Sequence, residues 1–178
     1  MKNRMLASAL AALFALPIAA HAASTRTHVS NSGSDANAAF SCDAAHPCRT
    51  FATALSVTTP GGEILAIDSS GYGKVVIDRS VSIIAAPGVF AGIGVGAGGN
   101  ATGVEIATAG VNVVLRGLTL TGQGGTSGID MSNGAGLSVE NCDFSNFTGA
   151  GVTDYTPAGV RIVDSRFRDN DRDATFSM

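Results

Sequence analysis

The sequence contains no tryptophan, and charged residues make up only 14% of its 178 residues, against about 25% in a typical soluble domain. Glycine is abundant instead, with 23 residues, where the usual share is about 7%. A chain with few lysines and glutamates and many glycines is poor material for helices and suits short strands joined by tight turns. The composition therefore predicts an all-β fold.

The chain also lacks an excess of positive charge, since its formal net charge is −3. Lys2 and Arg4 lie in a segment that we expect to be removed, which would bring the mature chain to about −5. A nucleic-acid binder needs a basic face. We therefore expect no nucleic-acid partner.

Residues 1–22 have the pattern of a signal peptide. A positively charged start precedes an apolar run over residues 5–20, and Ala20-His21-Ala22 forms a small-x-small cleavage site. A membrane anchor would need about 20 apolar residues, and Pro17 falls near the end of this run. No later segment is suited to span a bilayer. We expect a secreted or periplasmic protein, with attachment to the cell surface left open.

Three cysteines remain in the mature chain. Cys42 and Cys48 are six residues apart with Pro47 between them, and a disulfide closing this loop would contribute about 2–2.5 kcal/mol by the chain-entropy estimate. A metal site that includes His46 is the competing interpretation, but two cysteines and one histidine lack a fourth ligand. We predict a Cys42–Cys48 disulfide and no bound metal.

The second half of the chain contains a repeat. Residues 113–120, 137–144 and 160–167 carry the same apolar pattern at spacings of 24 and 23. A glycine followed by valine or isoleucine precedes each of them, at Gly103, Gly128 and Gly151. Self-similarity with this period is typical of solenoids, in which each unit buries its core against its neighbours.

Apolar residues alternate within each unit, as they do in strands. Val113 and Leu115 share one face, and Leu118 and Leu120 share another. The step of three between Leu115 and Leu118 requires a bend if both pairs are to face inward. The glycine column adds a third strand. Three strands per unit, stacked about 4.8 Å apart, predict a right-handed parallel β-helix over residues 23–178, with truncation at the C-terminus left open.

Stacking in register predicts which side chains form columns. We expect the inward columns to be Leu118/Cys142/Ser165 and Leu120/Phe144/Phe167, with Cys142 as a buried, unreactive thiol. We expect left-handed or locally hydrogen-bonded backbone at the bend columns Gly117/Asn141/Asp164 and Gly122/Asn146/Asp169. The outward columns are Thr119/Asp143/Arg166 and Thr121/Ser145/Arg168.

The first half is less regular. Helical spacing over residues 47–57 places Phe51, Ala54 and Leu55 on one face, and a Gly61-Gly62 turn and a strand over residues 63–67 follow. We expect the helix to cover the N-terminal end of the stack, because exposed edges invite aggregation. The glycine-dense residues 88–103 have no evident register, and we interpret them as a coil with a long turn.

Four pieces of this half resemble the N-terminal region of pectin-lyase-like right-handed β-helix proteins: residues 49–55, 61–65, 71–73 and 79–83. The opening residues 27–35 and the cysteine loop are similar to exported bacterial β-helix proteins of unassigned function. The resemblance covers roughly residues 26–170. It implies the fold, and such folds serve polysaccharide lyases, hydrolases, epimerases and purely adhesive proteins.

Within that family, hydrolases carry paired aspartates and a histidine on the coils, and lyases carry several acidic Ca²⁺ ligands with a catalytic Arg or Lys. This chain departs from both patterns, because His21, His28 and His46 all precede the coils. The alternating carboxylates of residues 169–173 fit a solvated charged turn better than a calcium loop. We therefore expect no catalytic residues and no cofactor, with Ca²⁺ as the one ion considered.

The remaining candidate site lies on the outward columns, where Asp143 and Arg166 would sit on adjacent rungs beside Arg168. These residues are our ligand-binding candidates, for an acidic sugar; a surface ion pair is the alternative. We expect a non-catalytic surface, matrix or glycan-binding module. The alternatives are a lyase of acidic polysaccharides and a fragment of a longer β-helix. An open C-terminal coil would dock a second copy.

Overall fold

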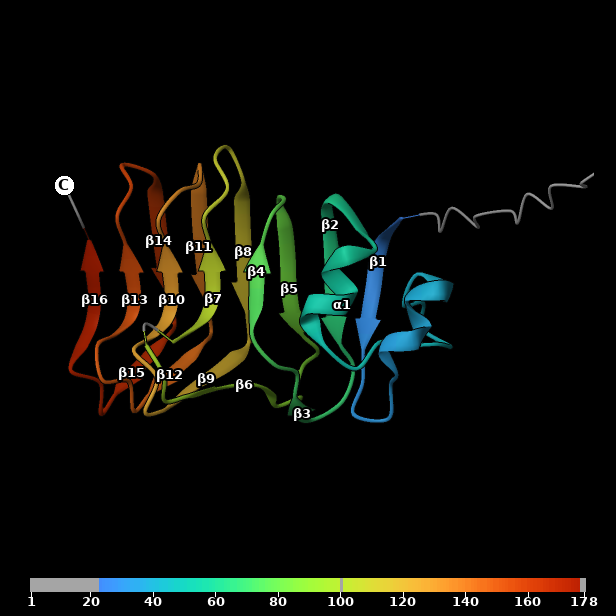
Figure 1. Cartoon of the computed structure of the whole chain (residues 1–178), viewed down its shortest axis with the longest axis horizontal. Coiled ribbons are helices and arrows are strands. Elements are labelled where there is room, and N and C mark those ends of the chain that lie inside the picture. Colours follow the sequence, from blue (N-terminus) through green and yellow to red (C-terminus); the bar gives the residue numbers. More distant parts are fainter. Residues whose placement is uncertain (1–22, 100, 177–178) are drawn as a thin grey trace, which may run out of the picture.

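The computed structural model describes residues 23–99 and 101–176, so the predicted signal peptide lies outside the described residues. The described chain is all-β apart from two short helices, and its strands form three parallel sheets (Figure 1). No helix of this described part is long and apolar enough to cross a membrane.

The first sheet contains six strands in the order β1-β2-β5-β8-β11-β14. Their bounds are β1 Ser24–Val29, β2 Thr58–Ala66, β5 Val81–Ala85, β8 Asn112–Arg116, β11 Gly136–Glu140 and β14 Gly159–Val163. Leu137 pairs in register with Val113 on one side and with Val160 on the other. The register predicted from the repeat is therefore confirmed.

The second sheet has the order β15-β12-β9-β6-β3, and the third has the order β16-β13-β10-β7-β4. The strands of the second sheet are β3 Ser70–Gly71, β6 Ala91–Gly96, β9 Leu118–Gln123, β12 Asp143–Ser145 and β15 Arg166–Arg168. Those of the third are β4 Val75–Ile77, β7 Thr102–Ile106, β10 Ser127–Met131, β13 Ala150–Asp154 and β16 Arg172–Phe176.

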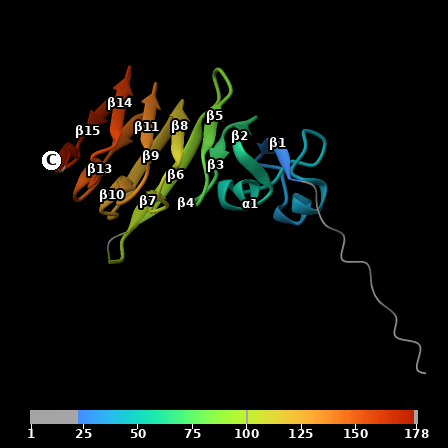
Figure 2. The ribbon, with the colours of Figure 1, turned by 90° about the horizontal axis from the view of Figure 1, so that it is seen from above.

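From β2 onwards the chain visits the first, second and third sheets in turn, and each visit adds one strand to each sheet. Equivalent strands therefore lie side by side along the long axis of the molecule (Figure 2). This arrangement is compatible with a parallel β-helix.

The inward side chains form one continuous core along the stack. Leu120 and Phe144 are fully buried, and the ring of Phe144 stacks on that of Phe167 with centroids 4.8 Å apart and planes 7° from parallel. Cys142 is a buried free thiol, as predicted. The predicted inward columns are confirmed except at Ser165, which is only partly buried and whose hydroxyl accepts from the Cys142 amide.

The first bend column behaves as predicted. Gly117, Asn141 and Asp164 all have left-handed backbone, with φ of 72°, 51° and 50°. In the second column Asn146 and Asp169 are left-handed, but Gly122 lies inside β9 without a positive φ. Gly122 lacks a side chain for a different reason, because a Cβ there would collide with the carbonyl of Asn146 on the next rung.

The helix of the first half is shorter than predicted. Helix α1 runs over Phe51–Ser56, and the Thr50 side chain caps it by accepting from the Thr53 amide. The predicted buried face of Phe51, Ala54 and Leu55 is confirmed. Pro47 and Cys48 instead belong to the loop closed by the Cys42–Cys48 disulfide, which is present as predicted.

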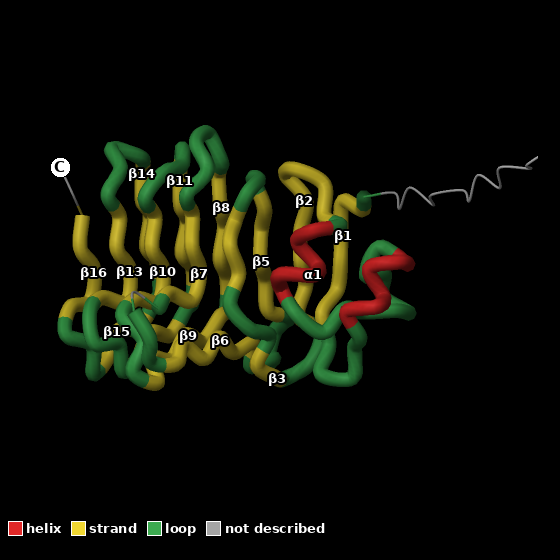
Figure 3. Tube along the Cα trace, in the orientation of Figure 1, coloured by secondary structure: helices red, strands yellow, loops and turns green. Residues whose placement is uncertain are grey.

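Both helices lie at the β1 end of the molecule (Figure 3). The other helix is a 3-10 helix, η1, over Asp35–Phe40, which precedes α1 in the chain. The Asp35 carboxylate accepts hydrogen bonds from the Arg49 and Thr50 amides. Gly61 and Gly62 lie within β2 rather than in a separate turn, at the irregularity where its pairing with β1 shifts between Thr58 and Glu63. Gly61 keeps a left-handed φ of 79° inside this strand.

Candidate functional site

The outer side of the second sheet changes character along the stack. One outward column contains Gly71, Gly92, Thr119, Asp143 and Arg166, and the next contains Gly94, Thr121, Ser145 and Arg168. Both columns therefore run from glycine through threonine to arginine. We call these nine residues the graded face.

The C-terminal end of the graded face brings the three predicted ligand-binding candidates together. The Asp143 carboxylate lies 3.6 Å from Nη1 of Arg166 and 3.3 Å from Nε of Arg168. Both guanidinium groups are exposed, and each keeps N–H donors that this carboxylate does not use. One carboxylate between two guanidinium groups leaves a net positive charge that an anionic group can pair with.

The threonines occupy the middle of this face and are partly exposed. Ser145, which also belongs to an outward column, is only 3% exposed, and its hydroxyl lies 3.5 Å from that of Thr121. The surface available to a ligand therefore consists of Thr119, Thr121 and the charged groups, without Ser145.

A hollow of about 290 Å³ lies at the glycine end of the graded face. Gly92 and Gly94 form part of its lining, together with Phe90, Thr119, Thr121 and Gln123. The sequence did not predict this hollow, because the glycine-dense residues 88–103 have no evident register in the repeat.

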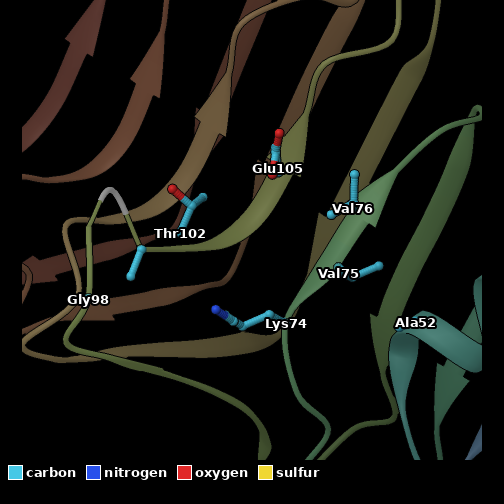
Figure 4. Close-up of a pocket in the computed structure, with 8 residues that line it drawn as sticks. Ala52, Lys74, Val75, Val76, Gly98, Thr102 and Glu105 are labelled. Atoms are coloured by element: carbon cyan, nitrogen blue, oxygen red, sulfur yellow. The ribbon is translucent and has the colours of Figure 1, made fainter.

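A second hollow, of about 480 Å³, lies on the outer side of the third sheet. Lys74, Val76, Thr102 and Glu105 line it, and the Lys74 side chain extends toward the segment that carries Gly98 (Figure 4). These residues come from β4, β7 and the chain next to them, so the register of the third sheet brings them together.

Glu105 pairs in register with Asp130 on the next rung of the third sheet. Partial burial, and then the charge of Glu105, raise the pKa of Asp130. The repeat itself contains a signal for this pair, because the two carboxylates follow Gly103-Val104 and Gly128-Ile129 at the same offset. The apolar columns alone do not reveal this pair, because Glu105 and Asp130 lie one residue beyond them.

Metal-ligating side chains are dispersed in the part of the chain that the structure describes, where no three of His, Cys, Asp and Glu gather closely enough to hold an ion. His46 lies in the disulfide loop, where it pairs with Asp43, 3.1 Å away, and it stacks on Phe40 at the end of η1. Burial raises the pKa of Cys142 to about 11, which keeps this thiol protonated and unreactive at neutral pH.

No family model, curated protein or solved structure matches this chain. The resemblance to pectin-lyase-like proteins therefore depends on the sequence motifs given above, and the function has to be argued from the geometry of the surface.

Proposed function

We propose that this chain is an exported, right-handed parallel β-helix that binds a polysaccharide along its graded face and catalyses no reaction. The path of the chain through three parallel sheets supports the β-helix, and parallel crossovers are right-handed in nearly all proteins. Helix α1 contacts β1 and β2, which fits a role in covering the N-terminal end of the stack.

The observation that carries the binding function is the graded face itself. Its five strands span roughly 19 Å at about 4.8 Å per rung, which suits an extended polymer better than a compact ligand. Hydroxyl groups in the middle and arginines at one end supply donors for sugar hydroxyls and for a carboxylate or sulfate. The ligand class that fits best is an acidic polysaccharide.

Titration calorimetry with acidic and neutral oligosaccharides tests this proposal. We expect Arg166→Ala/Arg168→Ala to lose affinity for the acidic ligands. Arg161→Ala is the matched control, because Arg161 is also an exposed arginine of the last rung and pairs with Glu140 at 3.0 Å, but on the first sheet. Absence of binding by the wild-type chain, or equal affinity of the double variant and the control, would overturn the proposal.

The second candidate function is that of a polysaccharide lyase. The hollow on the third sheet favours it, because Lys74 and Glu105 line this hollow and Asp130 lies beside Glu105 on the next rung, and such groups could move a proton next to a uronate. Ultraviolet absorbance of an unsaturated product, lost in Lys74→Met, would support catalysis. Absence of turnover on acidic polysaccharides to which the wild-type chain binds would reject it.

We also propose that the last rung docks a second copy of the chain. The inward side chains of β14 and β15, among them Val160, Ile162 and Phe167, are only partly buried. Sedimentation equilibrium tests this proposal. A dimer that Ile162→Asp dissociates would support it, and a monomer at all concentrations would favour either a different partner or a fragment of a longer β-helix.

A further inference from the structure

Phe90 is a large apolar side chain that stays 53% exposed beside the glycine end of the graded face. Its backbone is nevertheless fixed: its amide donates to Ser69 Oγ at 3.0 Å, and its carbonyl accepts from the Ser70 amide at 2.9 Å. The ring therefore occupies a defined place at the edge of the glycine hollow.

Backbone conformation does not explain why the positions beside this ring are glycine. Gly71, Gly92 and Gly94 lie in strands, and none of them has a positive φ. Glycine inside a strand costs about 0.5–1 kcal/mol relative to alanine, so another reason is needed for each of them.

Packing explains only one of the three. A Cβ on Gly92 would lie 2.8 Å from Cε1 of Phe90, so the ring itself requires this glycine. A Cβ on Gly71 would meet nothing closer than 3.9 Å, and one on Gly94 would make an ordinary contact with Gln123 at 3.5 Å. Gly71 and Gly94 thus keep open a space that the fold would allow a side chain to fill, as glycine does where a ligand approaches a strand closely.

The space has the two kinds of surface that a sugar ring presents. A pyranose has an apolar face of C–H bonds, which the negative face of an aromatic ring attracts, and a rim of hydroxyl groups. Phe90 supplies the aromatic ring, while Thr119, Thr121 and the exposed Gln123 amide supply donors and acceptors. At about 290 Å³, the hollow lies at the small end of ligand sites, which span about 300–1,000 Å³.

We infer that this hollow is a subsite for one pyranose ring, stacked against Phe90 on the open floor of Gly71 and Gly94. The inference rests on the proposed polysaccharide binding and adds a position to it. A single ring is held here, and the rest of the polymer runs along the threonines toward Asp143, Arg166 and Arg168.

The absence of tryptophan from the chain allows a direct test. Phe90→Trp places the only tryptophan at the hollow, and Phe40→Trp is the matched control, since Phe40 is 54% exposed at the end of η1. We expect oligosaccharide to shift the tryptophan emission of the first variant and not that of the second. Equal responses of the two variants would overturn the inference.

Affinity gives an independent readout. Phe90→Ala should weaken binding about 3- to 10-fold, the equivalent of one aromatic contact, with Phe40→Ala unchanged. Gly94→Val should fill the hollow and abolish binding while keeping the fold, and Gly159→Val, at an open position of β14, is its control. If the wild-type chain binds oligosaccharide and these variants bind equally well, the inferred subsite is wrong, but the proposed binding along the graded face is still supported. If the wild-type chain binds no oligosaccharide, both proposals fail.

Discussion

The ring of Phe144 packs over Gly128. A Cβ atom on Gly128 would lie 2.8 Å from Cδ1 of that ring and 2.5 Å from the carbonyl oxygen of Gly151 on the next rung. Gly128 and Gly151 therefore make room both for an aromatic ring of the core and for the neighbouring backbone, and Gly103 makes room for the Gly128 carbonyl and for Val95 and Ile93. Glycine is required here by close approach, because its φ is not positive.

Gly128→Ala should destabilise the protein by about 1–3 kcal/mol, the usual cost of overpacking a core. Urea unfolding followed by circular dichroism measures the change. Gly159→Ala is the control, since a Cβ there meets no atom within 4 Å, and its stability should stay the same or rise slightly. Equal midpoints for the two variants would contradict this account of the glycine column.

Asp143→Ala should abolish glycan binding while changing the free energy of unfolding by less than about 1 kcal/mol, because its arginine partners are exposed. The carboxylate fixes both guanidinium groups, so its loss leaves them without a common orientation. Glu140→Ala is the control, since Glu140 joins Arg116 and Arg161 in the same way on the first sheet. Unchanged or increased affinity would show that Asp143 does not organise the site.

The sequence predicted the fold where its repeat is strict. From β8 onwards each unit repeats the apolar columns, so register followed from alignment alone, and Asp143 met Arg166 as expected. The segment that forms β6 alternates glycine with apolar residues, which indicates its inward face. Its spacing to the next rung departs from the repeat, however, since Ile93 pairs with Leu120, 27 residues later, so its rung partners did not follow from alignment. The Phe90 hollow was therefore invisible until the register of β6 was known.

Two further differences have local causes. Helix α1 starts later than its apolar spacing indicated, because the Cys42–Cys48 loop and the Asp35 carboxylate hold the chain up to Thr50. Ser145 points outward, as its alternation with inward residues predicts, but it is buried. Alternation predicts which face of a strand a side chain lies on, and it does not predict whether other groups cover that face.

Cys142 should resist thiol reagents in the folded protein. It is buried, and its pKa of about 11 leaves very little thiolate at pH 8. Titration with Ellman's reagent should detect no reactive thiol before denaturation and one thiol per chain in denaturant. Rapid reaction of the native protein would mean that the core around β12 opens readily.

The disulfide and the export signal can be tested together by intact mass. When this sequence is expressed with export, the purified chain should have lost residues 1–22 and should gain two hydrogens on reduction. Cys42→Ser/Cys48→Ser should lose about 2–2.5 kcal/mol of stability, because the loop then gains freedom in the unfolded state. A mass that still includes residues 1–22, or no change of mass on reduction, would contradict the predicted cleavage or the disulfide.

Asp130 should make stability depend on pH. Partial burial and the neighbouring Glu105 raise its pKa in the folded state, so the folded chain holds this proton more tightly than the unfolded chain does. Ionisation therefore costs stability as the pH rises through the folded-state pKa. Asp130→Asn removes that cost, and it should raise the unfolding midpoint at pH 7 and lose this advantage as the pH falls toward 3.

Asp78 provides a control of opposite sign. The hydrogen bonds from Arg79 lower the pKa of Asp78, so its ionised form contributes stability above the unfolded pKa, and this contribution is lost as the pH falls through the folded pKa. Asp78→Asn should therefore lower the midpoint at pH 7. Thermal unfolding of both variants and the wild type from pH 3 to 8 measures the two effects. A lower midpoint for Asp130→Asn at pH 7 would mean that the Asp130 carboxylate makes a stabilising contact, and the pair with Glu105 would then not be a repulsive one.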